Sequence, residues 1–151
     1  MATNKKVKSE DLTPSTCYAV ALRILNYRFN SEAELRRKLA AKKFDDATVA
    51  ATLARLREEK WLDDDRFAGA YVRTRVRKGI GRLRIRGELR NAGVSDDAAE
   101  RAIREHGDGE EERLRAAYEK LSHRFGADRD KIAARLQRQG FEISAILNYL
   151  R

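Results

Sequence analysis

The 151-residue sequence contains one cysteine, one proline and nine glycines. A single cysteine, Cys17, excludes a disulfide within the chain and a cysteine-based metal cluster. So few prolines and glycines leave little of the turn punctuation that a many-stranded sheet requires. No run of about 18 apolar residues is present, so no membrane-spanning helix is predicted. The polar start, MATNKKVKSEDLTPST, lacks the apolar core of a signal peptide, and we expect a cytoplasmic protein.

Charge, by contrast, is abundant. Charged residues make up 38% of the chain, and its 33 lysines and arginines outnumber the 24 aspartates and glutamates by nine. This balance favours a polyanionic or acidic partner, although a positive surface can also serve solubility alone. The hydrophobic fraction of 42% is typical of a folded domain.

Three segments of the chain align with one another without internal gaps, at 30–53, 80–103 and 127–150. Their apolar residues share columns that are four or five positions apart. Steps of four place residues on one face of a helix, and steps of five cross a turn between two helices. The columns are Leu35, Ile85 and Ile132; Leu39, Leu89 and Leu136; Phe44, Val94 and Phe141; Val49, Ala99 and Ile146; and Leu53, Ile103 and Leu150.

The alignment extends upstream to one more helix in each unit, in which Cys17, Phe67 and Leu114 share a column. The predicted fold is therefore all-α, an elongated tandem array of three three-helix repeats that resemble helix-turn-helix units. We expect a flexible tail at 1–14, followed by repeats at 15–59, 60–106 and 107–151. The expected helices span 16–30, 32–42, 45–57, 64–78, 82–92, 95–106, 110–125, 129–139 and 142–150.

Polar residues precede these helices at positions where N-caps belong. Residues 31–34, Ser-Glu-Ala-Glu, form a capping-box pattern, and Asp45 and Ser95 precede later helices. The acidic triplets at 63–65 and 110–112 open helices, so we interpret them as caps that meet the positive end of the helix dipole rather than as a Mg²⁺ site.

The segment KGIGRLRIRGELRNAG at 78–93 alternates like a strand with one wet face, but the repeat alignment makes it a helix. On that helix Arg82, Arg86 and Arg90 form a ridge with steps of about 6 Å. The equivalent columns of the other repeats carry at most one arginine. The shared fold therefore does not require the ridge.

Eight basic residues against one acid, Glu88, give the interval 73–90 a net charge of +7, whereas residues 107–151 carry only +1. A solvated face would explain such a run, but its confinement to one repeat favours a binding surface. The predicted residues are Arg73, Arg75, Arg77, Lys78, Arg82, Arg84, Arg86 and Arg90, with Arg36, Arg37 and Lys38 as a secondary basic surface.

Two motifs resemble the RecX family, whose members regulate the RecA recombinase. They are SEAELRRKLAAKKF at 31–44 and the more specific WLDDDRFAGAYVRTRVRKGIGRLRIRGELRNAGV at 61–94. One departure is Arg82, where family members often place a proline at the first helical position. The resemblance implies a non-enzymatic, monomeric protein without a cofactor. It would bind RecA and the RecA–single-stranded DNA filament through the basic residues and restrain ATP hydrolysis, strand exchange and co-protease activity in DNA repair, recombination and the SOS response.

Other classes of function fit the sequence less well. A helix-turn-helix protein would read bases with the start of each third helix, but acids such as Asp45, Asp96 and Glu142 stand there and would be repelled by DNA. Non-specific phosphate contact through the preceding helix stays open, and a neutral HEAT-like or armadillo-like scaffold does not explain the +7. Cys17 is interpreted as a core residue. His106 and His123 are too isolated for a metal site or catalytic pair, and we expect no enzyme.

Overall fold

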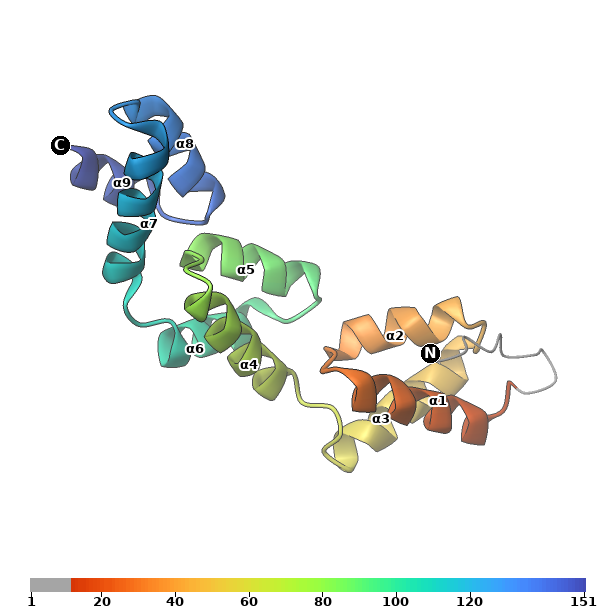
Figure 1. Ribbon diagram of the computed structural model, residues 1–151. Helices are drawn as coiled ribbons and strands as arrows, with labels where there is room; N and C mark the ends of the chain where they lie inside the picture. The colour runs from red at the N-terminus through yellow and green to blue at the C-terminus, as the bar shows by residue number, and fades with distance from the viewer. Residues whose placement is uncertain (1–11) are drawn as a thin grey trace. The chain divides into compact units, whose positions relative to one another are not determined.

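The computed structural model describes residues 12–151, and this part of the chain contains nine helices and no strand (Figure 1). The all-α prediction is confirmed, and each helix begins and ends within three residues of its predicted bounds. Of the predicted tail at 1–14, residues 1–11 lie outside the described residues. The helices are α1 (Pro14–Tyr27), α2 (Glu32–Ala41), α3 (Asp46–Glu58), α4 (Asp64–Arg77), α5 (Arg82–Asn91), α6 (Asp96–His106), α7 (Glu110–Phe125), α8 (Arg129–Arg138) and α9 (Ile143–Leu150).

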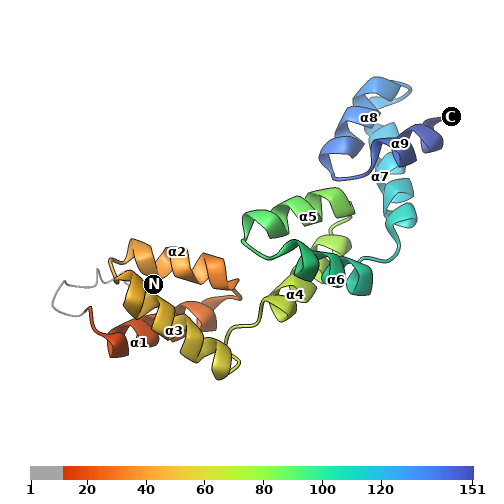
Figure 2. The same cartoon turned by 180° about the vertical axis from the view of Figure 1, so that it is seen from behind.

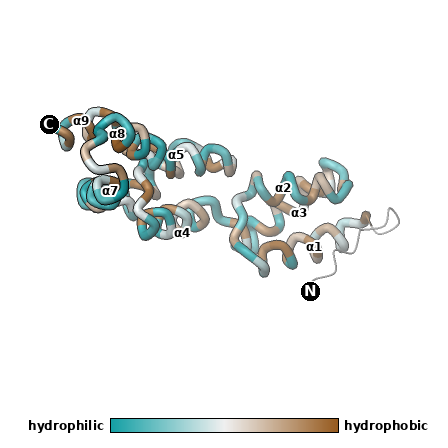
Figure 3. Tube along the Cα trace, turned by 45° about the horizontal axis from the view of Figure 1, so that its top comes forward, coloured by the Kyte–Doolittle hydropathy of each residue, from teal (hydrophilic) through white to brown (hydrophobic). Residues whose placement is uncertain are grey.

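The chain forms two compact units, one through Phe67 and one from Ala68 onwards. In the first unit α1, α2 and α3 pack on one another as a three-helix bundle (Figure 1). In the second unit α5 packs on α6, and α8 packs on both α7 and α9, as the opposite view also shows (Figure 2). Along the helices, short hydrophobic stretches are interrupted by hydrophilic ones, as amphipathic packing requires (Figure 3).

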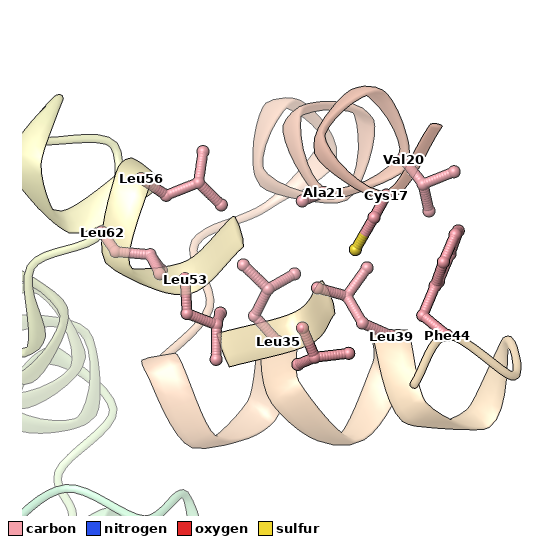
Figure 4. Packing of buried hydrophobic residues seen from close by; sticks show 10 residues of the cluster. Cys17, Val20, Ala21, Leu35, Leu39, Phe44, Leu53, Leu56 and Leu62 are labelled. Carbon is pink, nitrogen blue, oxygen red and sulfur yellow. The ribbon is translucent and has the colours of Figure 1, made fainter. Parts of the chain in front are cut away.

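The core of the first unit contains the predicted apolar columns together with Leu56 and Leu62, which belong to none of them. Cys17, Leu35 and Leu39 are fully buried, and in Figure 4 Cys17 points into the space between α1 and α2 where both leucines lie. Phe44 and Leu53 belong to the same buried cluster. Burial raises the pKa of the Cys17 thiol, which suits the predicted role as a small core residue rather than a nucleophile.

The second unit repeats this pattern. Leu89 and Leu136 are fully buried, and only 1% of the surface of Ile85 and of Ile132 is exposed. The last column is an exception, because Ile103 and Leu150 are only half-buried although Leu53 is fully buried. The shared columns therefore predict the buried residues correctly up to the middle of each third helix. At the end of the third helix they predict more burial than the second and third repeats have.

The helix starts use the predicted caps. Ser31 and Glu34 form a complete capping box, Asp45 accepts from the Thr48 N–H at 2.7 Å, and Ser95 accepts from the Ala98 N–H at 3.2 Å. The only proline of the chain, Pro14, lies at the start of α1 behind a Thr13 cap, which is why that helix begins two residues earlier than predicted. It also ends three residues earlier, because the Arg28 backbone is extended.

Two acids cap a helix of the preceding repeat instead of their own. Asp64, the first residue of α4, accepts from the Glu32 N–H of α2 at 2.9 Å. Glu110, the first residue of α7, accepts from the Arg82 N–H of α5 at 3.1 Å. The cap predicted for the first acidic triplet is confirmed at Asp63, whose carboxylate accepts from the Arg66 N–H. These acids thus connect successive repeats as well as starting helices.

Replacing Asp64 with alanine should lower the free energy of unfolding by about 1 kcal/mol, because the Glu32 N–H at the start of α2 would lose its partner. The measurement is urea unfolding monitored by circular dichroism. The control is Asp97→Ala, which removes an exposed acid from the first turn of α6 and should cost less. Equal losses in the two variants would show that Asp64 acts only through the helix dipole.

The start of α5 is held by the turn between α8 and α9. The Gly81 N–H donates to the Gln139 carbonyl at 2.8 Å, and the Leu83 N–H donates to the Gly140 carbonyl at 3.0 Å. The backbones meet so closely that a Cβ on Gly81 would lie 2.4 Å from the Gly140 carbonyl carbon and oxygen. This contact, called here the Gly81–Gly140 joint, fixes the second repeat against the third.

Candidate functional site

The eight predicted basic residues lie on two neighbouring elements of the chain. Arg73, Arg75 and Arg77 belong to the second half of α4, and Lys78 follows it. The remaining four are on α5. The turn between these helices contains Gly79, whose φ of +78° is the left-handed conformation that glycine adopts without strain. Both helices thus bring positive charge to one region of the second unit. The ion-pair partners of each side chain determine how much of this charge is available to a binding partner.

Arg82 is engaged within the Gly81–Gly140 joint. Its guanidinium lies 2.5 Å from a carboxylate oxygen of Glu142 and 3.4 Å from one of Glu110. The hydrogen bond to Glu142 raises the pKa of Arg82. Because the two acids come from the third repeat, Arg82 joins two repeats in addition to carrying charge.

The other two ridge arginines pair with α6. Arg86 forms an ion pair with Glu100, and Arg90 lies 3.2 Å from Asp96. The side chain of Arg90 remains 65% exposed, so its pair contributes little stability and leaves N–H donors turned to solvent. Arg86 is more enclosed, with 30% of its side chain exposed.

Glu88 collects a second group of partners between α4 and α5. Arg75 lies 2.7 Å and Arg84 2.9 Å from its carboxylate, and the Tyr71 hydroxyl donates to it. Burial alone would raise the pKa of Glu88, but the hydrogen bonds from Tyr71 and Arg75 outweigh it and lower that pKa. Burial and the same hydrogen bond raise the pKa of Tyr71 to about 12. This cluster fastens α5 to α4.

Acids from distant parts of the sequence therefore offset much of the charge counted along it. The interval 73–90 carries +7, but Asp96, Glu100, Glu110 and Glu142 bring four negative charges to it and leave +3. Three cations on and after α4 escape this pairing. Arg73 contacts only a His106 ring nitrogen at 3.3 Å, and Arg77 and Lys78 have no ion-pair partner among the residues that the structure describes.

These last two cations line a groove of about 820 Å³ that sequence reasoning missed. Its other walls are α7 and the end of α8, which contribute further basic side chains: Lys120, His123, Arg124 and Arg135. The third repeat has a net charge of only +1, so composition gave no signal there. The one available sign was the spacing of Lys120 and Arg124, four residues apart on a single helical face.

The predicted secondary basic surface lies on α2 of the first unit. Arg36 is exposed and pairs with Glu32 at 3.6 Å, and Arg37 is also exposed. Lys38 donates to the Asn30 side chain at 2.5 Å, and burial lowers its pKa. The three residues are therefore on one helix, but Arg36 and Arg37 expose their charge to solvent more than Lys38 does.

Two aromatic side chains outside the basic surfaces have different surroundings. Tyr118 packs edge-on against Tyr149 with ring centroids 4.8 Å apart, whereas Trp61 is 54% exposed. Within residues 12–151, no three histidine, cysteine, aspartate or glutamate side chains are grouped as metal ligands. No helix in the same range has the length and apolar character needed to cross a membrane.

Comparison with known proteins gives two family models that match successive parts of the chain. The model described as RecX, first three-helix domain, matches residues 17–56, and that described as RecX, second three-helix domain, matches residues 63–103. The first covers most of α1 to α3, and the second covers α4, α5 and most of α6. Together they span more than half of the sequence.

Curated relatives and solved structures agree with these models. Proteins named Regulatory protein RecX are 38% identical in Xanthomonas campestris pv. campestris strain B100 (83% of this chain, 80% of that protein) and 35% identical in Stenotrophomonas maltophilia strain R551-3 (95% and 89%). The match to the Serratia proteamaculans protein, at 38% identity, covers 55% of this chain and 62% of that protein, less than two thirds of its length. The crystal structure of RecX from Lactobacillus salivarius superimposes with a TM-score of 0.79 at 26% identity, covering 91% of this chain and 96% of that one.

Proposed function

The chain belongs to the RecX family, and on that premise we propose that it binds the RecA recombinase and its filament on single-stranded DNA and restrains RecA activity. The observation that carries the proposal is the match of both three-helix domain models, together with relatives named as regulatory proteins over most of their length. The activities to be restrained are DNA-dependent ATP hydrolysis, strand exchange and co-protease function.

The proposed contact surface is the basic region of α4 and α5. Arg73, Arg77 and Lys78 supply charge that no acid offsets among the described residues. Arg90 and Arg86 supply further N–H donors, because a guanidinium has five and their ion pairs occupy only some of them. A filament of protein and DNA presents carboxylates and phosphates, both of which guanidinium groups bind well.

Regulation of this kind needs no bond-making by the regulator. A bound protein lowers ATP hydrolysis only if it binds one conformation of the filament more tightly than the conformation that hydrolyses ATP. A tenfold difference in affinity corresponds to about 1.4 kcal/mol, which a few charge-assisted contacts can supply. The chain would thus act by shifting populations of RecA states.

The direct test is co-sedimentation with RecA filaments and the DNA-dependent ATPase rate of RecA. We expect the protein to pellet with the filaments and to lower the ATPase rate as its concentration rises, with an affinity that falls as salt is added. Full RecA activity at saturating protein, together with no co-sedimentation, would refute the proposal.

Reversal of the ridge charges should weaken filament binding. Arg86→Glu with Arg90→Glu is expected to lower the affinity roughly tenfold, since two cations of the surface become anions. Reversal also removes the pair with Glu100, so the matched control swaps that pair as Arg86→Glu with Glu100→Arg. The swap keeps both the ion pair and the net charge. If filament binding requires a cation at position 86, the swap stays weak, whereas full recovery would assign Arg86 a purely structural role.

A further inference from the structure

A second groove, in the first unit, is lined by apolar side chains that solvent reaches. It has a volume of about 720 Å³ and is formed by the second half of α1, the residues after it, and the segment that joins α3 to α4. Its apolar residues are Leu22, Leu25, Phe29 and Trp61. Phe29 is 59% exposed and Trp61 is 54% exposed. Exposed aromatic rings that line one hollow indicate a surface that another molecule covers, and this hollow is called here the Trp61 groove.

The shared fold does not require aromatic residues at these positions. In the gapless alignment of the repeats, the column of Phe29 carries Gly79 in the second repeat and Gly126 in the third. The column of Trp61 carries Asp108 in the third repeat. The other repeats therefore fold with a glycine or an acid where the first unit exposes a ring, so the rings of the Trp61 groove have a role other than packing.

The backbone at the end of α3 fixes the position of Trp61. The Lys60 N–H donates to the Arg57 carbonyl at 3.0 Å, and the Trp61 N–H donates to the Leu56 carbonyl at 2.9 Å. This pair of hydrogen bonds is a Schellman motif, in which the residue after the cap is left-handed. Lys60 adopts that conformation, with φ of +63°, although side chains other than glycine rarely do. Because the turn is already formed, little backbone ordering is needed when a partner binds beside Trp61.

The charge around the two rings is positive. Three cations line the groove: Arg23, Lys60 and Arg66. None of them has an ion-pair partner among the residues that the structure describes. Glu59 is the acid of the lining, and its carboxylate accepts from the Tyr18 hydroxyl and from Arg55 at 2.8 Å. These hydrogen bonds lower the pKa of Glu59 and leave the lining with a charge of +2.

We propose that the Trp61 groove binds an acidic peptide segment of a partner protein, with an apolar side chain of that segment packed against the rings. The Arg66 guanidinium lies 5.8 Å from the centroid of the Phe29 ring and donates to the Lys60 carbonyl at 3.1 Å. Its position beside an aromatic ring offers a carboxylate and an apolar group adjacent contacts. Tryptophan and arginine are also the residues that most often dominate the binding energy of protein interfaces.

Two other occupants fit the groove less well. Residues 1–11 of this chain contain three lysines against Glu10 and Asp11, so their net charge has the same sign as that of the groove. A nucleic-acid strand carries a charge at every nucleotide, but the lining offers it three cations beside an acid. The aliphatic surface of Leu22 and Leu25 instead suits an apolar side chain. Charge and apolar surface together therefore favour an acidic peptide.

The inference goes beyond the proposed function, because it concerns a surface outside α4 and α5 and its test contains no RecA. The probe is a short fluorescein-labelled peptide of glutamates and phenylalanines, and its binding to the full chain is measured by fluorescence anisotropy. In two comparison peptides, serine replaces each phenylalanine or glutamine replaces each glutamate. Weaker binding of both comparison peptides would show that the groove uses apolar and charged contacts together.

Two groove variants have matched controls in the same chain. Lys60→Glu is matched by Lys43→Glu, because both lysines are exposed and left-handed, with φ of +63° and +74°, and Lys43 is outside the groove lining. Trp61→Ala is matched by Leu147→Ala, which removes a side chain that is 51% exposed in α9. We expect each groove variant to raise the Kd for the glutamate–phenylalanine peptide roughly tenfold and each control to leave it unchanged.

Circular dichroism melting shows whether any variant has lost its fold. If Trp61→Ala melts early, Phe29→Ala replaces it, since Phe29 is also exposed and should give a similar loss of binding. Trp61→Phe, which keeps a ring at that position, should retain most of the affinity.

Four results would overturn the proposal. They are no binding of the glutamate–phenylalanine peptide, equal weakening by Lys60→Glu and Lys43→Glu, tighter binding of an oligothymidylate at the same groove, and self-association of the full chain that Trp61→Ala abolishes. The third result would make a nucleic acid the occupant, and the fourth a second copy of this chain. None of them bears on co-sedimentation with RecA filaments, so the two proposals can be judged separately.

Discussion

Replacing Gly81 with alanine is expected to lower the free energy of unfolding of the second unit by about 2–5 kcal/mol. The added Cβ would lie 2.4 Å from the carbonyl atoms of Gly140 and 2.7 Å from the Phe141 nitrogen, and backbone atoms cannot turn aside as a side chain can. Overpacking of this kind costs about 1–3 kcal/mol or more. Separation of the backbones would also strain the bonds from the Gly81 and Leu83 N–H groups, each worth about 0.5–1.5 kcal/mol.

Gly87 provides the matched control in the same helix. A Cβ there would meet no atom within 4 Å, and the residue sits inside α5, where alanine is favoured over glycine. Gly87→Ala should therefore stabilise the protein by about 0.5–1 kcal/mol. The free energy of unfolding of both variants is measured by urea unfolding monitored by circular dichroism. A Gly81→Ala protein as stable as the Gly87→Ala protein would contradict the Gly81–Gly140 joint.

The joint also explains the arginine at the first position of α5. The Arg82 N–H donates to Glu110, and its guanidinium reaches Glu142 and Glu110. A proline, which the family resemblance leads us to expect there, has no N–H and could not form the first of these bonds. In this chain the departure from the family pattern therefore adds contacts between the second and third repeats.

The helices and the inner core could be predicted from the sequence because they depend on local patterns. Leu39, Leu89 and Leu136 recur at equal spacings, and helical geometry alone places such residues inside. Caps such as Ser31 and Asp45 accept from N–H groups three residues away, so both partners of each hydrogen bond lie within one short segment of the sequence. Glycines occupy the same column before the third helix of the second and third repeats, at Gly93 and Gly140, and both adopt the left-handed conformation. The first-repeat equivalent, Lys43, adopts it as well, with φ of +74°.

The charged surface could not be predicted in the same way, because ion pairs join residues that are distant in sequence. Arg82 and Glu142 are separated by 60 positions, and Arg86 and Glu100 by 14. A count of charges along 73–90 includes the arginines and omits those acids. The groove was missed for a related reason, since Lys120 and Arg135 belong to a repeat in which eight acids nearly cancel nine basic residues in a sum along the chain, although only Glu112 and Glu119 of those acids line the groove.

Leu89→Ala is expected to cost about 2–5 kcal/mol, whereas Leu83→Ala, in the same helix, should cost less than about 1 kcal/mol. Leu89 is fully buried and its truncation leaves a cavity, but Leu83 is 40% exposed and its neighbours already include water. The comparison tests how the segment Arg82-Leu83-Arg84-Ile85-Arg86 is folded. In a strand Leu83 and Ile85 would share one buried face, and Leu83→Ala would then be costly.

In the helix, Ile85 and Leu89 face the core while Leu83 does not, so the two leucines should differ sharply. Unfolding by urea followed at the helical circular dichroism band measures both losses, and the helical signal of each folded variant should equal that of the unaltered protein. Because both substitutions leave all charges in place, neither should alter the salt dependence of the proposed binding to RecA filaments. A large loss for Leu83→Ala with little for Leu89→Ala would reverse the inward face of α5 and, with it, the side on which the ridge arginines lie.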